Sequence, residues 1–513
     1  MKVLFVYPNW TREYGIIAHF AKRAGVYPPL NLALLAAIAE RHGHEAVIID
    51  AEVDCIPMPK LIEKAIAQKA DLIAITGKSP FFHLSRDFGS GIKKAGCATP
   101  IVIGGPHITI MEAEAFFPEF DYGVVGECEN IWPVLLERLE KGLSVADVKG
   151  VLYRDRGEIK YTGKNVYDRD LDKLPFPARH LLPMARYRIG TLQGRKNFTS
   201  IQTVRGCPWK CIFCASEALN TTSVGRRSAE LVIAEMKEVI ARFNIRHFMI
   251  VDDVLTLDRK HITDICDRII AEKLNITFEG STRANLIDEP LIIKMKAAGL
   301  ARLSFGLETV DEEMRKTMKK KVPLEYYSRA NALLGKYDIE ALNSVMLGLP
   351  GETKATVKKT LDFLKNDRNV KQANFAIAVP YPGTEFHEMA KKGERGLKLM
   401  TKDFSEYRRY GSAVTTVGDL TPEDLIELQN EGFVSIYSPP WRWRPMLRKH
   451  GLVGGALMLL RVFKLSTVKA LGKYRFFREH PAFQVFFKKK HFKPNLNDPQ
   501  VFPSTNERVM VTN

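Results

Sequence analysis

The sequence predicts an α/β protein with a doubly wound parallel sheet, then a partial (βα)6 barrel of the TIM type, and then a basic helical C-terminal region. Short apolar runs alternate with stretches of helical period in the first third of the chain, which predicts the first sheet. Six further strand signals alternate with amphipathic stretches in the middle, which predicts the barrel. A concentration of Lys and Arg near the end marks the C-terminal region.

The first sheet is predicted from five apolar runs bounded by turn residues, at 2–7, 45–50, 71–76, 100–103 and 122–125. Helical segments between them, for example 31–42 and 84–95, favour parallel strands with helices on both faces. Such sheets bind ligands at the carboxyl ends of their strands. The candidates at these ends are Thr76, Lys78, Ser79, Gly104, Gly105, His107, Gly126, Glu127 and Glu129. Glycines after a strand are also ordinary turn residues, so this pattern alone does not identify a ligand.

The six strand signals of the barrel lie at 200–204, 247–251, 276–279, 302–305, 341–347 and 372–378. Amphipathic stretches such as 229–243 separate them. Catalytic residues of barrels gather at the carboxyl ends of the strands. The polar residues at these ends include Asp252, Asp253, Ser281, Arg283 and Glu308. As an alternative, one of the two aspartates, but not both, would cap the helix expected over 257–271.

Cys207, Cys211 and Cys214 stand in the run R-G-C-P-W-K-C-I-F-C. Three thiolates on so short a loop can hold three irons of a 4Fe-4S cluster and leave the fourth iron open. An open iron can bind the amino and carboxylate groups of S-adenosylmethionine (SAM) and pass an electron to its sulfonium, which gives a 5'-deoxyadenosyl radical. The alternative is a zinc site, but zinc usually takes a fourth Cys or His at short spacing. The next cysteine, Cys266, is far along the chain in an expected helix.

This motif, with Phe213 directly before its last cysteine, resembles the signature of the radical SAM superfamily. The resemblance implies that Phe213 lies against the SAM adenine and that Asp252 and Asp253 stand where the SAM amino group is bound. It implies that Ser281 and Arg283 meet the SAM carboxylate or ribose, and that Glu308 contacts ribose or methionine.

The resemblance extends further along the barrel. Lys320 is a candidate carboxylate partner, although the run 319–321 also fits a solvated face. The run L-G-L-P-G-E-T at 347–353 matches the family's turn against the adenine, which assigns Gly348 and Pro350 to SAM. Tyr381, after the sixth strand, is a candidate for facing the substrate.

The segments 28–32, 42–45, 104–107, 126–129 and 174–179 resemble, in this order, the domain that precedes the barrel in cobalamin-dependent radical SAM enzymes. The resemblance covers about residues 1–380 and implies a Rossmann-like domain whose strand-end residues bind cobalamin. The D-x-H-x-x-G run that gives an imidazole to cobalt in other cobalamin enzymes is missing, so we expect no protein histidine beneath the metal. Cys128 stands where the family usually has glycine, and its side chain would either crowd the nucleotide tail or be tolerated.

The 513 residues, with 45% hydrophobic content, are enough for two or three domains. We expect a cobalamin-binding domain at 1–145, a linker at 146–192, the radical SAM barrel at 193–390 and the basic helical region at 391–513. Four of the seven cysteines are scattered singly, which favours a reducing cytoplasm over a disulfide framework. No apolar stretch has the length of about 18 residues that a membrane-spanning helix needs.

The segment 441–493 holds fourteen Lys and Arg against one acidic residue, so it supplies +13 of the formal net charge of +17. Aromatic residues are interleaved with these charges, a composition typical of helices in an anionic membrane interface. This predicts peripheral attachment to the inner face of the membrane. A nucleic-acid arm would use the same residue types, but no RNA-binding module accompanies it, and we expect no nucleic-acid partner. The other alternative is a helical cap packed on the barrel.

These features predict a radical SAM enzyme that uses a 4Fe-4S cluster, SAM and cobalamin to methylate an unactivated carbon, with an organic and amphiphilic substrate. In that scheme the deoxyadenosyl radical removes a substrate hydrogen and the carbon radical takes a methyl group from methylcobalamin. An electron donor such as flavodoxin or ferredoxin is implied. The same architecture serves non-methylating cyclases and oxidoreductases, which remain an alternative. A zinc- or nucleic-acid-binding scaffold protein is the alternative from another class.

Overall fold

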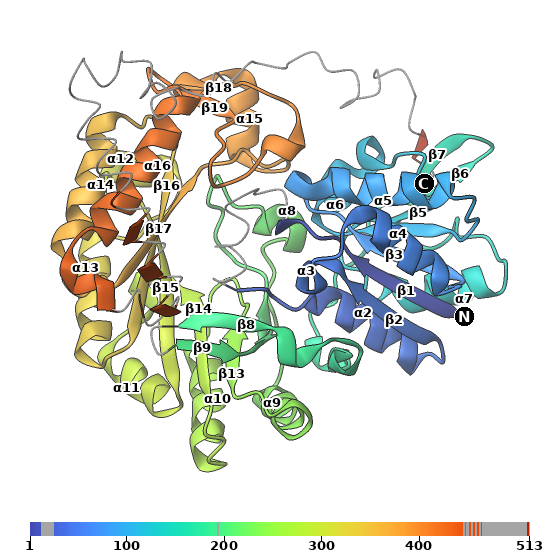
Figure 1. Ribbon diagram of the computed structural model, residues 1–513, viewed down its shortest axis with the longest axis horizontal. Helices are drawn as coiled ribbons and strands as arrows, with labels where there is room; N and C mark the ends of the chain where they lie inside the picture. The colour runs from blue at the N-terminus through green and yellow to red at the C-terminus, as the bar shows by residue number, and fades with distance from the viewer. Residues whose placement is uncertain are drawn as a thin grey trace.

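Two large sheets, one mixed and one all parallel, lie side by side and form the body of the molecule (Figure 1). The computed structural model describes residues 1–11, 25–191 and 194–444, together with a few single residues and pairs within 447–463 and the pair 510–511. Both alternations of strands and helices that the sequence predicts are confirmed.

The first sheet has the strand order β2-β1-β3-β4-β5-β6-β7-β20. Its parallel part consists of β1 (Lys2–Tyr7), β2 (Glu45–Asp50), β3 (Leu72–Thr76), β4 (Ile101–Gly104) and β5 (Tyr122–Val124). Two antiparallel strands, β6 (Val151–Asp155) and β7 (Glu158–Tyr161), extend it, and the short β20 (Met510–Val511) pairs in parallel with β7. The sequence did not predict this extension.

Helices cover both faces of the first sheet, as the doubly wound prediction requires. One face packs on α2 (Leu30–Arg41) and α7 (Ile131–Glu140), and the other on α4 (Met58–Ala67) and α5 (Phe82–Lys94). Successive residues of a strand point to opposite faces of the sheet. Val3 and Phe5 of β1 therefore pack in one core, and Leu4 and Val6 pack in the other. The short helices α3 (Ala51–Asp54) and α6 (Pro106–Met111) follow β2 and β4.

The second sheet is all parallel, with the strands in chain order. It consists of β10 (Thr199–Ile201), β13 (His247–Ile250), β14 (Thr277–Thr282), β15 (Leu300–Glu308), β16 (Glu340–Leu347) and β17 (Gln372–Ile377). β10 and β17 do not pair with each other, so the barrel is open, as predicted.

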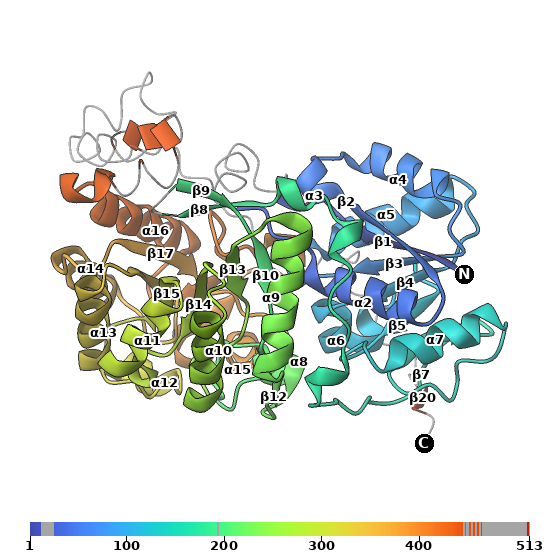
Figure 2. The same ribbon diagram turned by 90° about the horizontal axis from the view of Figure 1, so that it is seen from below.

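Helices lie along the outer face of this sheet, where Figure 2 shows α9, α10, α11 and α13. The helices between the strands are α9 (Ala229–Phe243), α10 (Arg259–Ala271), α11 (Glu289–Ala297), α12 (Glu312–Thr317), α13 (Leu324–Lys336) and α14 (Lys354–Asn366). Leu303, Phe305 and Leu307 of β15 pack against them, whereas Ser304 and Gly306 face the other way and are partly exposed. This alternation leaves the inner face for ligands.

The helix α16 (Pro422–Tyr437) covers the open edge of the barrel at β17. Its Gln429 amide donates to the Phe375 carbonyl at 2.7 Å, and its Tyr437 hydroxyl donates to the Ala373 carbonyl at 3.0 Å. The barrel is thus completed by side chains of a helix instead of a further strand.

Arg442, just beyond this helix, is only 1% exposed. Its guanidinium donates to five backbone carbonyls, those of Leu364, Lys365, Asp367, Val370 and Ile436. Arg442, the second residue of the basic segment 441–493, therefore packs on the barrel. Most of the segment lies outside the described residues.

The hairpin of β8 (Arg188–Thr191) and β9 (Gly194–Asn197) precedes the barrel. Between β10 and β13 come β11 (Val204–Arg205), α8 (Ser216–Asn220) and β12 (Gly225–Arg226), and β11 pairs with β12. Between β17 and α16 come α15 (Glu385–Lys392) and the pair β18 (Leu397–Leu399) and β19 (Thr415–Val417). Within the described part of the chain, no helix combines the length and apolar character needed to cross a membrane.

Candidate functional site

The cysteine motif forms a loop between β11 and α8. The loop begins at Gly206, whose φ of +96° and lack of a side chain allow close packing, because a Cβ there would overlap the Ser223 carbonyl. The thiols of Cys207, Cys211 and Cys214 are free and partly exposed. The loop is folded on itself, since the Cys214 amide donates to the Cys211 carbonyl at 3.0 Å.

The three thiols do not converge on one point. Among the described residues, no three Cys, His, Asp or Glu side chains are arranged to hold a single metal ion. A 4Fe-4S cluster takes each thiolate on a different iron, so the three thiols need not bind one and the same metal ion. Cys266 lies on the buried face of α10, in the barrel core, and burial raises its pKa to about 12, so it is no fourth ligand.

The residues expected around SAM come together at the carboxyl ends of the barrel strands. Phe213 packs against the same apolar cluster as Met346 of β16, and its ring centre lies 5.8 Å from the Lys320 ammonium. Arg283 is buried, with its guanidinium 4.2 Å from the ring centre of Trp209 in the cysteine loop. Its Nε has no hydrogen-bond partner in the protein, which leaves a buried donor for a ligand.

Glu308 and Lys320 form a buried ion pair, with 2.6 Å between Oε1 and Nζ. Burial alone would lower the pKa of Lys320, but Glu308 outweighs this effect and raises it. Lys320 lies between α12 and α13 rather than in a helix. Lys319 and Lys321 are exposed to solvent, as the alternative of a solvated run of lysines requires, but Lys320 is buried. The pair folds over Gly306, where there is no room for a Cβ.

The two aspartates after β13 have different environments. Asp252 is buried and accepts hydrogen bonds from the amides of Thr203 and Val204 and from the Thr203 hydroxyl. Burial raises its pKa to about 6. Its carboxylate thus fixes the chain before the cysteine loop, and the expected contacts of Asp252 and Asp253 with the SAM amino group stay predictions. Asp253 accepts from the Ser216 hydroxyl at 2.9 Å, and α10 is capped by Asp258 rather than by either aspartate.

The turn after β16 is organised by Glu352, a residue that the sequence analysis did not single out. Its buried carboxylate accepts from the amides of Gly348 and Leu349, and burial raises its pKa to about 8. Gly348 has a φ of +87°, a conformation that favours glycine, and Pro350 is buried in the same turn. A buried carboxylate therefore shapes the loop expected to meet the adenine.

Ser281 and Tyr381 complete the set of expected barrel residues. Ser281 is exposed on the inner side of β14, where a ligand can reach it. Tyr381 is partly buried among Val379, Tyr407 and Val414, and its hydroxyl donates to the Tyr407 carbonyl at 3.2 Å. This contact ties Tyr381 to the C-terminal segment, so its expected role toward the substrate stays a prediction.

A cavity of about 380 Å³ lies between the first sheet and the segment that carries the cysteine loop. Seven of the nine expected cobalamin residues line it: Thr76, Lys78, Gly104, Gly105, Gly126, Glu127 and Glu129. Arg205 of β11 and Leu219 and Asn220 of α8 form the opposite wall. The cavity volume is in the range of cofactor and small-molecule sites.

Two features of this cavity fit a bulky ligand. The buried Thr76 hydroxyl has no hydrogen-bond partner in the protein. A Cβ at Gly104 would extend into open space, with the Cys128 sulfur at 3.8 Å as its nearest neighbour. Cys128 itself lines the cavity, as its position in the sequence suggested, and burial raises its pKa to about 12.

Ser79 and His107 are not among the residues that line the cavity. The His107 Nδ1 lies 3.1 Å from the Ser79 hydroxyl, and its ring packs on Phe82 and Phe404. Burial lowers the pKa of His107 to about 3. Its expected contact with cobalamin stays a prediction, and none of the described lining residues is a histidine.

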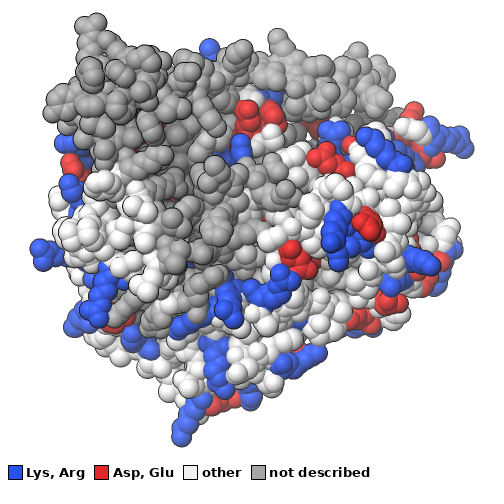
Figure 3. Space-filling model, viewed as in Figure 1, with Lys and Arg blue, Asp and Glu red and all other residues white. Residues whose placement is uncertain are grey.

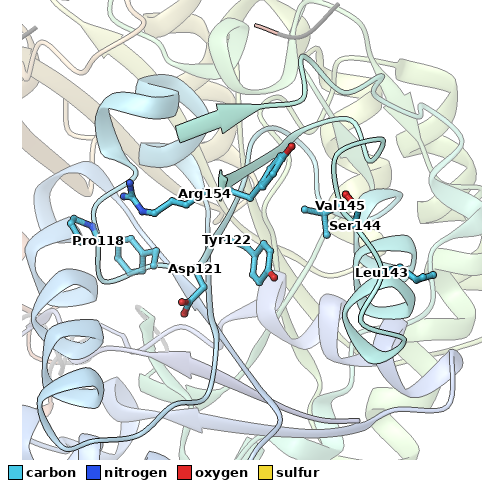
Figure 4. Close-up of a pocket in the computed structure, with 9 residues that line it drawn as sticks. Pro118, Asp121, Tyr122, Leu143, Ser144, Val145 and Arg154 are labelled. Atoms are coloured by element: carbon cyan, nitrogen blue, oxygen red, sulfur yellow. The ribbon is translucent and has the colours of Figure 1, made fainter. Parts of the chain in front are cut away.

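A second pocket lies at the opposite edge of the first sheet, where the parallel strands begin (Figure 4). It is lined by residues such as Asp121, Tyr122, Leu143 and Arg154. Asp121 pairs with Lys93 and accepts from the Ile101 amide, so its carboxylate serves the fold. None of the expected site residues lines this pocket.

Two known protein families match separate parts of the chain. Residues 201–364 match the radical SAM superfamily, and residues 17–136 match the B12 binding domain. An uncharacterized methyltransferase of Pyrococcus horikoshii is 28% identical over 86% of this chain and 93% of its own length. The anaerobic magnesium-protoporphyrin IX monomethyl ester cyclase of Rubrivivax gelatinosus is 27% identical over 79% of this chain and 72% of its own length.

The fold is shared with a solved structure of the radical SAM methyltransferase TsrM from Kitasatospora setae, described with cobalamin and a 4Fe-4S cluster bound. The two chains are 16% identical with a TM-score of 0.69, and the match covers 91% of this chain and 99% of that one. The chain thus carries a radical SAM domain that is preceded by a B12-binding domain.

Proposed function

We propose that the protein is a cobalamin-dependent radical SAM methyltransferase that acts on an unactivated carbon. One observation carries the proposal: the cavity lined by the glycines of the first sheet is closed on its other side by Arg205 and α8, which flank the cysteine loop. In this proposal, the two cofactor sites open onto the same space between the sheets.

The chain's own residues fit both cofactors. The unpartnered Nε of Arg283 and the free thiols of the loop fit SAM on an open iron, since a guanidinium binds carboxylates well. The unpartnered Thr76 hydroxyl and the space beside Gly104 fit cobalamin. Bound there, the cluster would supply an electron to cleave SAM and cobalamin would supply a methyl carrier.

The residues around the SAM site would orient it and exclude water. Arg283 would bind the carboxylate, and Glu308, held by Lys320, would accept from a ribose hydroxyl or the ammonium group. The turn at Gly348 would place backbone against the adenine, and Glu352 keeps this turn in shape. Each methylation would consume two SAM and two electrons, and would release one methionine, one 5'-deoxyadenosine and one S-adenosylhomocysteine.

This stoichiometry is the test. The anaerobically reconstituted protein, supplied with SAM, cobalamin, a low-potential donor such as flavodoxin or ferredoxin, and a lipid extract as the source of the methyl acceptor, should form equal amounts of S-adenosylhomocysteine and methylated product. The relative from Rubrivivax gelatinosus supports a second candidate, a non-methylating cyclase or oxidoreductase. In that case deoxyadenosine would accompany an unmethylated product and no S-adenosylhomocysteine would form.

We propose further that the substrate is amphiphilic and that segment 441–493 holds the protein at an anionic membrane surface in the cytoplasm. Its composition supports this, because it supplies most of the net charge, whereas Figure 3 shows Lys and Arg mixed with Asp and Glu over the described surface in that view. Trp441 and Trp443 at its start are 48% and 40% exposed.

A chain ended after Arg444 tests the membrane proposal, because it keeps the buried Arg442. It should retain its cluster and its SAM cleavage but lose the binding to anionic liposomes that the full chain shows at low salt. Equal sedimentation of both proteins with liposomes would contradict the proposal. Mass spectrometry of lipids from a deletion strain would identify the substrate.

A further inference from the structure

Four charged side chains connect the first domain to the cysteine loop. We call them the ionic bridge: Glu127, Glu129, Arg169 and Arg205. The Arg205 guanidinium lies 2.8 Å from Glu129 and 3.7 Å from Glu127. Arg169 lies 2.8 Å from the other oxygen of Glu127. All four side chains are less than one-fifth exposed, so the bridge is largely shielded from water.

Each arginine of the bridge also contacts the barrel segment near the cluster. Arg169 donates to the Asn220 carbonyl at 2.5 Å and to the Ser223 hydroxyl at 2.7 Å, at the end of α8 and just beyond it. Arg205 stands two residues before Cys207, and its backbone pairs with Gly225 in the β11–β12 ladder. The bridge therefore connects the two ends of the segment that holds the thiols.

The acids of the bridge come from the turn that forms one wall of the cavity. Glu127, Glu129 and Arg205 all line it. The sequence had assigned the two glutamates to cobalamin, but their carboxylates are paired with arginines. Burial raises the pKa of Glu127, and Arg205 and Arg169 act against this rise. With two acids and two guanidiniums, the bridge presents no net charge to the phosphate of a cobalamin tail.

We propose that the ionic bridge is a positioning device that fixes the distance between the cobalamin cavity and the cluster, and that Arg205 is its central positioning residue. Buried ion pairs contribute little net stability compared with apolar packing, but their directional contacts fix geometry. The inference rests on the proposed function, because two cofactors must share one substrate for their separation to matter. Neither glutamate is then required as a ligand of cobalamin.

The test compares Arg205→Lys, which keeps the charge but loses the forked contact, with Arg205→Gln and Glu129→Gln. The matched control is Arg138→Gln, which breaks an exposed ion pair with Asp147 in the same domain. For each protein we measure the iron and cobalamin content and the formation of deoxyadenosine and S-adenosylhomocysteine. Pulsed electron paramagnetic resonance gives the distance between cob(II)alamin and the reduced cluster.

We expect the Arg205 variants to keep both cofactors and to cleave SAM to deoxyadenosine within about twofold of the parent. The cobalt-to-cluster distance distribution should broaden, and S-adenosylhomocysteine formation should fall about tenfold or more. Arg205→Lys should fall between Arg205→Gln and the parent, and Arg138→Gln should match the parent.

An unchanged distance distribution in Arg205→Gln would overturn the inference, and so would a joint loss of iron and cobalamin, which would show a role in folding only. If the parent binds both cofactors but forms no S-adenosylhomocysteine, the proposed methyltransferase function fails. The distance measurement would still decide the inference about the bridge.

Discussion

Gly306→Ala is the sharpest test of the SAM site, because it adds one methyl group exactly where Glu308 and Lys320 meet. The backbone at Gly306 is not in the left-handed region, so alanine can adopt it. Its Cβ, however, would overlap both Oε1 of Glu308 and Nζ of Lys320. The two side chains must move apart to make room.

The free-energy cost of Gly306→Ala follows from the weaker attraction between the Glu308 carboxylate and the Lys320 ammonium. With an effective dielectric constant of about 20, the attraction falls from about 6 kcal/mol at the observed 2.6 Å to about 4 kcal/mol at about 4 Å. The loss of about 2 kcal/mol corresponds to a factor of about 30 in an equilibrium constant. Because Glu308 is a proposed SAM contact, we expect SAM affinity to fall by about 10- to 30-fold and thermal stability to decrease, with the cluster retained.

Anaerobic titration calorimetry with SAM, together with a thermal melt and iron analysis, measures these effects. The matched control is Gly104→Ala, whose Cβ would meet only the Cys128 sulfur at 3.8 Å, on the other side of the space between the sheets. SAM affinity and melting temperature both equal to the parent's would show that the pair tolerates the methyl group, and the placement of SAM beside Glu308 would then be wrong.

Three further predictions follow from the same structure. Gly104→Ala should leave the cluster and the fold intact but lower cobalamin content, measured by absorbance, because the new methyl group enters the cavity; full cobalamin content would place the cofactor elsewhere. Replacing Cys207, Cys211 and Cys214 by alanine should remove the four irons and all SAM cleavage, while replacement of the buried Cys266 alone should leave both; SAM cleavage in the triple variant would refute the cluster assignment. Burial raises the pKa of Glu352 to about 8, above its value of about 4.5 in an unfolded chain. Between these two pH values the folded state keeps a proton that the unfolded state releases, so the free energy of unfolding should fall as the pH rises from about 4.5 to 8. Glu352→Gln should flatten this dependence in chemical unfolding, and an unchanged slope would show that Glu352 is ionised when folded.

The sequence was sufficient for the elements whose pattern is local. The strands of both sheets were found because apolar runs and helical periods are read from neighbouring residues, and α9 was predicted at its observed bounds. The two antiparallel strands β6 and β7 were not predicted, because they add to a sheet edge through pairing that only the folded chain shows.

The candidate site was harder to predict where a residue's partner is distant in sequence. Nothing near Asp252 shows that its carboxylate will bind the amides of Thr203 and Val204, about 50 residues earlier. The burial of Lys320 between two exposed lysines depends on Glu308, and the pairing of Glu127 with Arg169 depends on a linker segment. Glu352 could have been noticed, since a carboxylate four residues after a strand-end glycine is placed to cap the turn.

The helix that covers β17 has a consequence for solubility. An open barrel exposes two edge strands, and an unpaired edge can recruit the strand of another molecule. On β17 the outward carbonyls of Ala373 and Phe375 are already occupied by Tyr437 and Gln429, and the Ile377 amide donates to the Arg409 carbonyl. The protein can therefore keep its barrel open without offering this edge as a template for aggregation.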